Sequence, residues 1–402
     1  MIHDNNIKMK YIVIISESAS FPWGMAASSR VKLIAKGLIH KDYNVQYIGL
    51  RGAESEYSTN KKRKGEVEGV KYKYPGIFTT RSKIWVFRRI DDILGKWLSV
   101  LYIIKLKLHH KIDLIILYTR KYKVVKYWSI IAKTINIKII LEICEWPITR
   151  NYSTNAKLFC NKAPAIVDGV LPISIFIENE INKISIRESR QIPSYKIPIL
   201  IDPGKFQKKC DLNTTLTSSY ILYSGSLNYP IITNLILDIM VLLKKEGYRN
   251  KLVFTGGGNE EKYKKHLLDA KMKKIDDLIE FTGYLEEDVF IEKLLKASLL
   301  LAPIPNDLQT EARFPTKLGF YLTSGNPVIT NPFGEVKYYL EDNKNVLFIS
   351  EFNAEQFKEK IIYALNHREK CQRIGKNGKD LALKEFDYKH AFNCLNDFLK
   401  KL

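Results

Sequence analysis

Short runs of apolar residues alternate with helix-length segments along the whole chain. In a run such as Tyr11–Ser16 the apolar residues are almost continuous. The segment that follows places them at Val31, Ile34 and Leu38, which is the spacing of one helical face. Continuous apolar strands that alternate with helices are typical of parallel sheets covered on both faces. The pattern therefore predicts an α/β protein with doubly wound parallel sheets.

In the first half of the chain, a helix is expected after the first strand and another at 122–135. Residues 51–66 are charged and poor in apolar residues, so we expect an exposed loop there. The predicted strands are Tyr11–Ser16, Val45–Leu50, Ile112–Tyr118, Ile137–Ile143, Gly169–Ser174 and Lys196–Ile201.

The second half repeats the same alternation. Its predicted strands are Tyr220–Ser224, Lys251–Thr255, Ile279–Thr282, Ser298–Ala302, Pro327–Thr330 and Val346–Ile349. Its predicted helices lie at about 231–246, 260–272, 286–296, 315–323, 335–342 and 353–366.

The 402 residues are too many for one ordinary hydrophobic core. A polar segment, Asp202–Ser219, separates the two halves and is typical of a linker. We therefore predict a Rossmann-like domain over residues 1–202 and a second over 203–385. Ligands of such sheets bind beyond the carboxyl ends of the strands, so we expect them in the cleft between the domains.

The apolar run after the polar first ten residues is too short for the core of a signal peptide. The longest helical apolar stretch, near Trp97–Ile104, falls short of the ~20 residues that span a bilayer. The five cysteines are widely spaced, without a C-x-x-C pair, which favours reduced thiols. These features predict a cytoplasmic protein.

Positive charge is concentrated in the first half. Residues 1–200 hold 34 of the 64 Lys and Arg residues but only 16 of the 43 Asp and Glu residues. Within this half, Arg81–Lys111 combines basic residues and tryptophans with helical apolar spacing, which suits the surface of an anionic membrane. Nucleic acid is a competing partner, and a core helix with a solvated basic face is the plainer alternative.

The stretch "EARFPTKLGFYLTSGNPVIT" carries the strongest candidate chemistry. Pro315 fits the first turn of a helix, and Gly325 fits the position just past its end. Arg313 and Lys317 then lie at the helix N-terminus, where cations oppose the macrodipole unless an anion sits between them. A nucleotide diphosphate would fit this position. The alternative is that both cations are solvated surface charges.

Two other loops of the second half could meet a phosphate. In "VFTGGGNEE", Gly257 could let a phosphate or sugar approach the backbone, although the full G-x-G-x-x-G spacing is missing. In "LYSGSLN", the Ser226 hydroxyl and the N–H groups near Gly225 could donate to phosphate. A tight turn and a helix cap are the respective alternatives.

Two loops of the first half could serve an acceptor. Gly24, in "FPWGMAASSR", leaves room beside the first strand. Glu145, in "LEICEWP", follows another strand and could orient an acceptor hydroxyl or take its proton. The alternative for Glu145 is pairing with a nearby cation. No D-x-D, H-E-x-x-H or P-loop pattern occurs, so we expect no protein-bound catalytic metal.

The ordered set "PWGMAASSRVKLIAKGL", "DGVLPIS", "YSGSLN", "VFTGGGNEE" and "FPTKLGFYLTSGNPVI" resembles the family-4 type glycosyltransferases with the GT-B fold, as found in bacterial capsule and surface-polysaccharide clusters. The resemblance covers almost the whole chain. It implies that the second domain binds a UDP- or GDP-type nucleotide sugar and that the first binds the acceptor. It also implies retention of anomeric configuration, no cofactor, no metal, and a C-terminal helix at about 386–402 that packs back onto the first domain.

The resemblance distributes the candidate site residues over three roles. The catalytic candidates are Glu145, Arg313 and Lys317. The donor-binding candidates are Gly225, Ser226, Gly257, Tyr284, Leu285, Glu311, Thr316 and Leu318. The acceptor-binding candidates are Gly24, Arg30 and Trp146.

One departure from the family pattern concerns the ribose of the donor. The family's E-x7-E motif would place its second Glu at Phe320 and its first at Ala312, one position from Glu311. The leading hypothesis is a retaining hexosyltransferase that acts on a saccharide or polyprenyl-linked acceptor at the inner membrane face, with no nucleic-acid partner. The alternative, prompted by Phe320, is a catalytically weak relative that serves as a scaffold subunit. A nucleic-acid binder is a third reading, which rests on charge alone.

Overall fold

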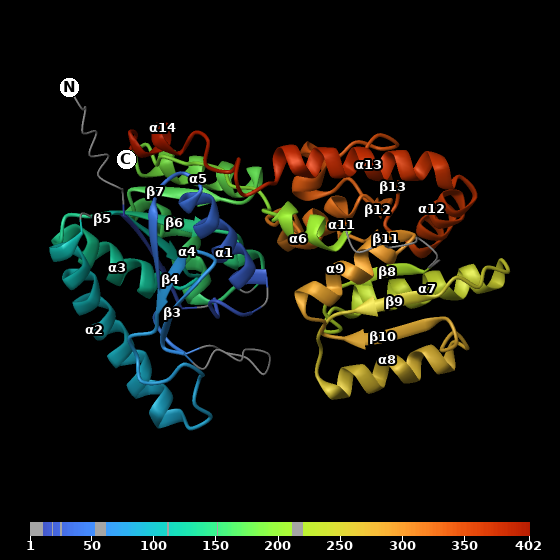
Figure 1. The fold of residues 1–402 in the computed structure, drawn as a ribbon, viewed down its shortest axis with the longest axis horizontal. Helices are drawn as coiled ribbons and strands as arrows, with labels where there is room; N and C mark the ends of the chain where they lie inside the picture. The colour runs from blue at the N-terminus through green and yellow to red at the C-terminus, as the bar shows by residue number, and fades with distance from the viewer. Residues whose placement is uncertain are drawn as a thin grey trace. The chain divides into compact units, whose positions relative to one another are not determined.

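The computed structural model describes residues 11–17, 19–24, 26–52, 62–110, 112–150, 152–210 and 220–402. The chain forms two compact units (Figure 1). Unit 1 comprises Met1–Leu200 and Tyr388–Leu402, and unit 2 comprises Ile201–Asp387. The two places where the chain passes between the units are adjacent, since the Ile201 N–H donates to the Phe386 carbonyl oxygen at 2.9 Å.

Unit 1 is built on a sheet with the strand order β3-β4-β2-β1-β5-β6-β7. Neighbouring strands run parallel, except that β3 and β4 form an antiparallel pair at the edge. The strands are β1 (Tyr11–Ser16), β2 (Asn44–Gly49), β3 (Lys64–Val67), β4 (Val70–Lys73), β5 (Ile112–Tyr118), β6 (Lys138–Ile143) and β7 (Gly169–Pro172).

Helices cover both faces of this sheet, with α2 and α3 on one side and α1 on the other (Figure 1). The helices of unit 1 are α1 (Ala26–Ile39), α2 (Trp85–His109), α3 (Tyr122–Thr134), α4 (Thr154–Lys162), α5 (Ile175–Arg187) and α14 (Leu395–Leu399). The C-terminal segment joins the core beside α1, where Phe392, Leu395 and Phe398 are buried. Its regular helix is limited to the five residues of α14.

The long helix α2 packs onto unit 1 through its small and polar side. The Asp91 carboxylate accepts hydrogen bonds from the backbone N–H groups of Ile77 (2.6 Å) and Phe78 (3.2 Å). At Gly95 the helix approaches the sheet so closely that a Cβ would lie 2.3 Å from the Leu50 carbonyl oxygen. The buried residues of α2 are Asp91, Gly95, Ser99 and Ile103.

Unit 2 is built on a parallel sheet with the order β10-β9-β8-β11-β12-β13. The strands are β8 (Ile221–Ser224), β9 (Leu252–Thr255), β10 (Ile279–Gly283), β11 (Leu299–Ala302), β12 (Val328–Thr330) and β13 (Leu347–Phe348). The helices are α6 (Pro203–Cys210), α7 (Pro230–Lys245), α8 (Glu260–Met272), α9 (Glu287–Lys296), α10 (Leu308–Glu311), α11 (Thr316–Ser324), α12 (Ala354–Asn366) and α13 (Arg368–Glu385).

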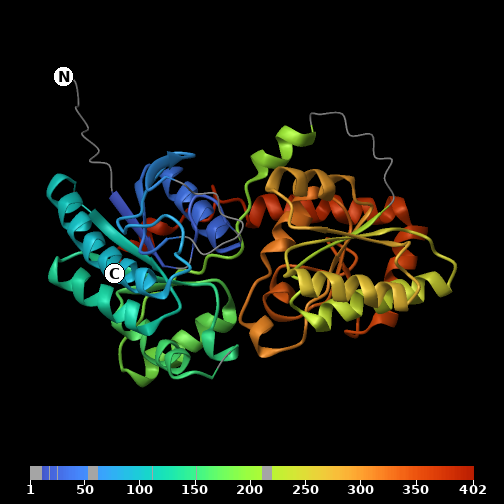
Figure 2. The same ribbon diagram turned by 90° about the horizontal axis from the view of Figure 1, so that it is seen from below.

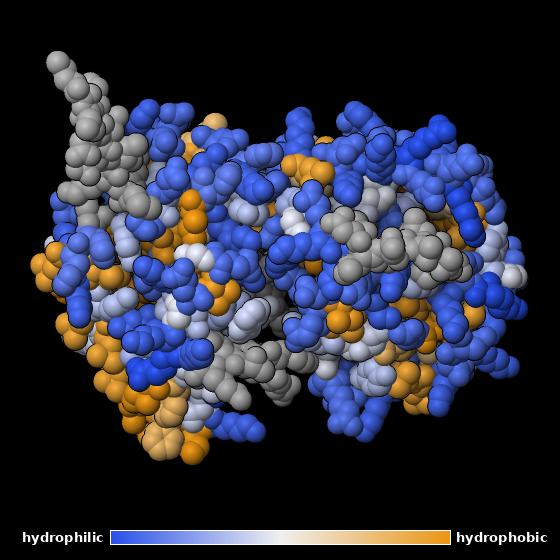
Figure 3. Space-filling model, in the orientation of Figure 1, coloured by the Kyte–Doolittle hydropathy of each residue, from blue (hydrophilic) through white to orange (hydrophobic). Residues whose placement is uncertain are grey.

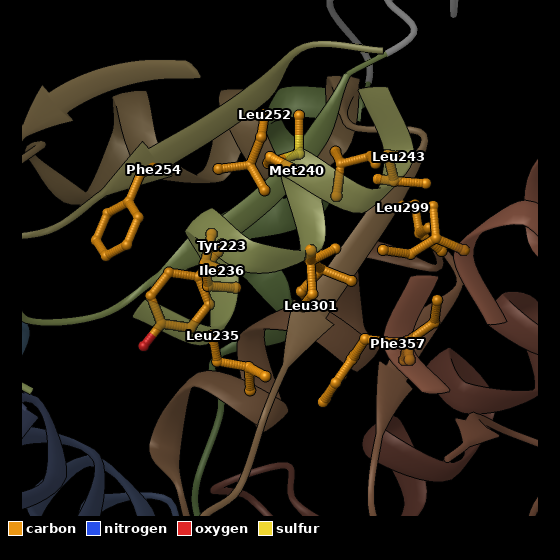
Figure 4. Packing of buried hydrophobic residues seen from close by; sticks show 14 of the residues in the cluster. Tyr223, Leu235, Ile236, Met240, Leu243, Leu252, Phe254, Leu299, Leu301 and Phe357 are labelled. Atoms are coloured by element: carbon orange, nitrogen blue, oxygen red, sulfur yellow. The ribbon is translucent and has the colours of Figure 1, made fainter. Parts of the chain in front are cut away.

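The helices of unit 2 form a layer on each face of its sheet (Figure 2). Helices α7 and α12 pack together on one face, and α6, α9, α11 and α13 contact one another on the opposite face. The core beneath α7 contains the aromatic pair Tyr223–Phe254 and aliphatic residues from β9 and β11 (Figure 4). This core holds the carboxyl ends of the strands in fixed positions, and the candidate site is built on those ends.

The predicted parallel strands are confirmed at most positions, and several other sequence predictions differ from the structure. Residues 196–201 form no strand, because prolines at 193 and 198 leave only isolated bridges there. The predicted linker, Asp202–Ser219, begins beside the division between the units, but its first part forms α6, whose single large apolar residue, Phe206, gives too weak a helical pattern to detect. Residues 211–219 of it lie outside the described residues. The predicted loop 51–66 overlaps β3, a polar edge strand; residues 53–61 of it lie outside the described residues.

The close approach at Gly95 gives a first testable prediction. Replacing Gly95 with Ala would gain about 1 kcal/mol of helix propensity. Its Cβ would nevertheless meet a backbone carbonyl, and such overpacking costs about 1–3 kcal/mol. We expect Gly95→Ala to lower the free energy of unfolding by about 1 kcal/mol, measured by urea denaturation. The neighbouring Lys96→Ala is the control, and equal stability of Gly95→Ala and wild type would contradict this packing.

Candidate functional site

The strand order of unit 2 reverses direction between β8 and β11. From β8 the chain proceeds outward through β9 and β10, and from β11 it proceeds the other way through β12 and β13. Ligands of open α/β sheets bind beyond the carboxyl ends of the strands at such a switch point. Here those ends are Ser224 of β8 and Ala302 of β11. The loop after β8 and the N-terminus of α11 therefore form the candidate site.

Two side chains of α11 hold the peptide groups of Ser224. The Lys317 ammonium donates to the Ser224 carbonyl oxygen at 3.3 Å, and the Tyr321 hydroxyl accepts from the Ser224 N–H at 2.6 Å. Lys317 also lies over the Tyr223 ring, 4.3 Å from its centroid. Lys317 and Tyr321 are four residues apart, so they lie on the same face of α11. Their two hydrogen bonds fix that face against the end of β8.

The Lys317 ammonium has no anionic partner within the described residues. No carboxylate there lies within the 4.0 Å of an ion pair, and burial lowers the pKa of Lys317 to about 7. Helix α11 begins at Thr316, and Pro315 provides no side-chain cap for it. The first N–H groups of α11 and the Lys317 side chain therefore suit an anion.

Glycines bring the loops after β8 and β9 into contact. The Gly225 N–H donates to the Thr255 carbonyl oxygen at 2.9 Å, and the Gly256 N–H donates to the Gly283 carbonyl oxygen at 2.8 Å. A Cβ on Gly256 would lie 1.9 Å from the Gly225 carbonyl oxygen, and its φ is +140°. Only glycine fits at position 256, because any side chain would collide with the Gly225 backbone. The backbone after β9 can therefore approach the end of β8 closely.

Two of the predicted phosphate donors in the loop after β8 have hydrogen-bond partners within the protein. The Ser226 hydroxyl donates to the Gly257 carbonyl oxygen at 3.2 Å and accepts from the Asn228 N–H at the same distance. The N–H of Gly225 is likewise used within the sheet. These hydrogen bonds shape the loop, and a phosphate contact from the Ser226 hydroxyl would replace one of them.

The remaining donor-side candidates lie around α11 and after β10. Thr316 opens α11, and Leu318 is fully buried, so it can offer only its backbone. Glu311 ends the short helix α10. Tyr284 and Leu285 follow β10, with Tyr284 37% exposed.

Arg313 lies between α10 and α11, close to Gln309. When the Gln309 amide is oriented to satisfy both groups, its oxygen accepts from both terminal nitrogens of Arg313, at 2.7 and 2.6 Å. Arg313 is therefore held beside the start of α11 by a neutral partner. A diphosphate would be a stronger acceptor than an amide for the same guanidinium.

In unit 1, the candidate residues lie near the carboxyl ends of β5 and β6. A small pocket there is lined by residues 118–120 and 142–145. Glu145 forms an ion pair with Arg120 at 2.6 Å, as its plainer alternative supposed. Burial raises the pKa of Cys144 to about 12, so its thiol stays protonated and cannot act as a nucleophile at neutral pH.

Two predicted acceptor contacts are structural residues. Arg30 is 6% exposed; it pairs with the buried Glu142 at 2.5 Å and donates to the carbonyl oxygens of Pro198 and Ile197. Burial raises the pKa of Glu142, and the Arg30 guanidinium opposes that rise. Trp146 is 3% exposed, so its ring offers no open face to a sugar. Gly24 remains partly accessible in the loop before α1.

The sequence did not reveal Tyr321 and Asn331. Tyr321 lies four residues after Lys317, a spacing that could have suggested a shared face. Asn331 is buried, and its side chain exchanges two hydrogen bonds with the backbone of Ile304 in the loop after β11. No local pattern points to that contact. The described residues contain no group of three or more His, Cys, Asp or Glu side chains that could hold a metal ion.

Comparisons with solved structures identify the architecture. Sucrose-phosphate synthase from Thermosynechococcus elongatus is 13% identical, with a TM-score of 0.71 and 98% of each chain covered. HepE from Anabaena, in complex with UDP and glucose, is 13% identical, with a TM-score of 0.70, 97% of this chain and 100% of that chain covered. WaaG, a glycosyltransferase involved in lipopolysaccharide biosynthesis, is 14% identical, with a TM-score of 0.62, 96% of this chain and 99% of that chain covered.

The chain has the GT-B fold. Residues 205–381, within unit 2, match the model of the family described as glycosyl transferases group 1. A search of curated proteins found no match. The family match and the fold together support a glycosyltransferase.

The packing between helices of unit 2 gives Phe320 a structural explanation. Its ring packs against Phe206 of α6, with centroids 6.1 Å apart, and against Phe290 of α9, at 5.8 Å. Ion pairs from Lys205 to Glu287 and from Lys209 to Glu292 join the same two helices. Phe320 therefore helps to attach α6, which opens unit 2, to the face formed by α9 and α11.

Removing the Lys317 charge should stabilise the unliganded protein. Below pH 7 the folded chain bears the full cost of a buried charge, whereas between pH 7 and 10.5 the unfolded chain binds a proton that the folded chain lacks. Wild-type stability should therefore rise over that window. We expect Lys317→Met to raise the free energy of unfolding by about 1 kcal/mol or more at pH 6.5, with the difference shrinking towards pH 10.5. Urea denaturation at several pH values measures this, and a destabilised Lys317→Met protein would contradict it.

Replacing Phe320 with Glu tests its packing role. A carboxylate between two rings loses apolar contact and is poorly solvated, so we expect a loss of about 2 kcal/mol in unfolding free energy. Phe320→Leu should lose less because it keeps an apolar side chain. Thermal unfolding compares the three proteins. A Phe320→Glu protein as stable as wild type and with tighter nucleotide binding would show that position 320 faces the ligand instead.

Proposed function

We propose that the protein is a retaining glycosyltransferase that moves a hexose from a UDP- or GDP-linked donor to a saccharide or polyprenyl-linked acceptor. The observation that carries the proposal is the Lys317 ammonium, which has no carboxylate partner among the described residues and lies at the positive end of α11, at the switch point of the unit 2 sheet. The leaving group of such a transfer is a diphosphate, which carries the charge that this position lacks.

The chain's own groups account for activation of the donor. The Lys317 ammonium and the first N–H groups of α11 would hold the diphosphate and stabilise charge as it departs. Arg313 would exchange its amide contact with Gln309 for a phosphate oxygen. Three protein groups would thus carry a charge that other enzymes neutralise with a metal ion, so metal-independent transfer without a cofactor belongs to the proposal.

The remaining roles follow the resemblance. Tyr284 and Leu285 would meet the nucleotide base, and Glu311 the donor sugar. Glu145, held by Arg120, would orient the acceptor hydroxyl from unit 1. HepE was solved with UDP-glucose, which supports a UDP-hexose donor. WaaG acts in lipopolysaccharide biosynthesis, which supports a role in bacterial surface polysaccharides at the cytoplasmic face of the membrane.

A scaffold subunit is the second candidate, and Phe320 is the observation that favours it. The position where the family keeps a ribose-binding Glu is occupied here by a ring packed between α6 and α9. An unmade hydrogen bond of this kind weakens binding by about 1–3 kcal/mol. That is compatible with slow transfer as well as with a binding role.

Calorimetric titration with UDP and GDP tests the proposal. We expect one nucleotide to bind and to take up a proton at pH 8, because the diphosphate restores the charge of Lys317. Affinity should fall by up to about tenfold per pH unit above pH 7. Lys317→Met should weaken binding by at least about tenfold, whereas Lys317→Arg, which is charged throughout, should bind without this pH dependence.

The matched control is Lys244→Met, which removes a lysine of α7 that is already paired with Asp277 at 2.8 Å. It should bind the nucleotide as wild type does. Binding together with nucleotide release from a sugar donor supports the transferase, and binding without release supports the scaffold. If neither nucleotide binds, or if Lys317→Met binds as tightly as wild type, the assigned site is wrong.

A further inference from the structure

Helix α2 exposes its large apolar side chains to solvent. Those of one stripe are Ile90 (41% exposed), Leu94 (38%), Trp97 (65%), Leu101 (60%), Ile104 (38%) and Leu108 (80%). Their spacing of three and four residues places them on a single face along most of the helix. Figure 3 shows the corresponding orange surface along the lower left edge of the molecule, where Figure 1 places α2.

The amphipathic character of α2 is reversed relative to an ordinary surface helix. Such a helix buries its apolar stripe and exposes its polar side. Here Asp91, Gly95 and Ser99 face inward, and the Asp91 hydrogen bonds and the Gly95 contact fix that orientation. Rotating α2 to bury the stripe would break both. A continuous apolar surface of this kind on a folded unit marks an interaction site.

Unpaired cations flank the stripe. Arg89, Lys96 and Lys105 have no carboxylate within 4.0 Å in the described part of the chain. Nearby, β3 sets Lys64 directly opposite Lys73 of β4. Burial lowers the pKa of Lys73, and the neighbouring Lys105, Lys64 and Arg63 lower it further. Cations gathered at one edge, with no carboxylate of the described residues within ion-pair distance of Arg89, Lys96 or Lys105, indicate a negatively charged partner.

We propose that the outward face of α2, comprising this apolar stripe with Arg89, Lys96 and Lys105, binds the surface of an anionic lipid bilayer. The helix would lie in the plane of the interface, with the stripe among the acyl chains and the cations at the headgroups. Trp85, 67% exposed, and Trp97 add rings with an N–H group, which suit that boundary. No helix of the described residues meets the length and hydropathy needed to cross a bilayer.

A second copy of this chain is the competing occupant, and charge disfavours it. A two-fold dimer through α2 would bring the same patch of each copy together. The three cations beside the stripe, Arg89, Lys96 and Lys105, would then face their own counterparts, and the single carboxylate of Asp92 near them would not balance the repulsion. An anionic lipid surface accommodates both the apolar side chains and the cations.

Vesicle flotation with the full-length protein tests the proposal without any need for sugar transfer. Wild type should float with vesicles of phosphatidylglycerol and phosphatidylcholine and much less with phosphatidylcholine alone. The double variant Trp97→Asp with Leu101→Asp should partition more than about tenfold less. The triple variant Arg89→Gln, Lys96→Gln and Lys105→Gln should lose about fivefold per cation.

The matched control is Leu268→Asp with Met272→Asp, which changes two exposed apolar residues four apart on α8 of unit 2 (57% and 66% exposed). It should float as wild type does.

If the aspartate variant of α2 unfolds, quenching of wild-type tryptophan fluorescence by brominated lipid provides a second measurement, and strong quenching is expected. The proposal is overturned if wild type does not bind the anionic vesicles, or if the control variant loses as much binding as the α2 variant. It is also overturned if ultracentrifugation shows a dimer that the α2 variant dissociates while vesicles are not bound.

Discussion

Lys317 is half-buried, and its ammonium group rests on a carbonyl oxygen and an aromatic ring, neither of which carries a full negative charge. Such a position costs free energy, and burial accordingly lowers the pKa of the group. The surrounding structure fixes it nevertheless. Tyr321 anchors α11 to the backbone N–H of the same residue, Ser224, and the glycine contact behind it keeps β8 and β9 close together. Unit 2 thus holds the Lys317 ammonium without a negatively charged partner, and an anionic ligand would supply one.

Two helices of this chain depart from the local rules of helix design in opposite ways. Helix α11 places a cation at its positive end, and α2 turns its apolar side chains towards water. Each departure is enforced by contacts elsewhere: the Ser224 peptide for α11, and Asp91 and Gly95 for α2. Local violations that the fold actively maintains are the places where function is expected. The two positions lie in different units, so the proposed nucleotide site and the proposed membrane surface belong to separate parts of the chain.

The sequence predicted those features that depend on local pattern. Alternating apolar runs gave nearly all the parallel strands, and the helix end at Gly325 was confirmed by its left-handed conformation, with φ +79°. Pro315 proved to be the N-cap residue just before the helix, one position earlier than its predicted place in the first turn. What the sequence could not show depends on partners far along the chain. Arg30, which was predicted to contact the acceptor, instead pairs with Glu142, 112 residues away, in the interior of unit 1.

Phe320 shows how one position can serve folding at the expense of a ligand contact. The resemblance to family-4 glycosyltransferases implies a carboxylate at this position of α11. In this chain the same position meets Phe206 and Phe290, so its ring helps to attach α6 at the point where the chain enters unit 2. A carboxylate would leave those two rings without their common partner, which makes the three aromatic residues interdependent. The departure from the family pattern is therefore one element of a packed cluster, and under the proposed function donor binding would rely more heavily on Lys317 and the start of α11.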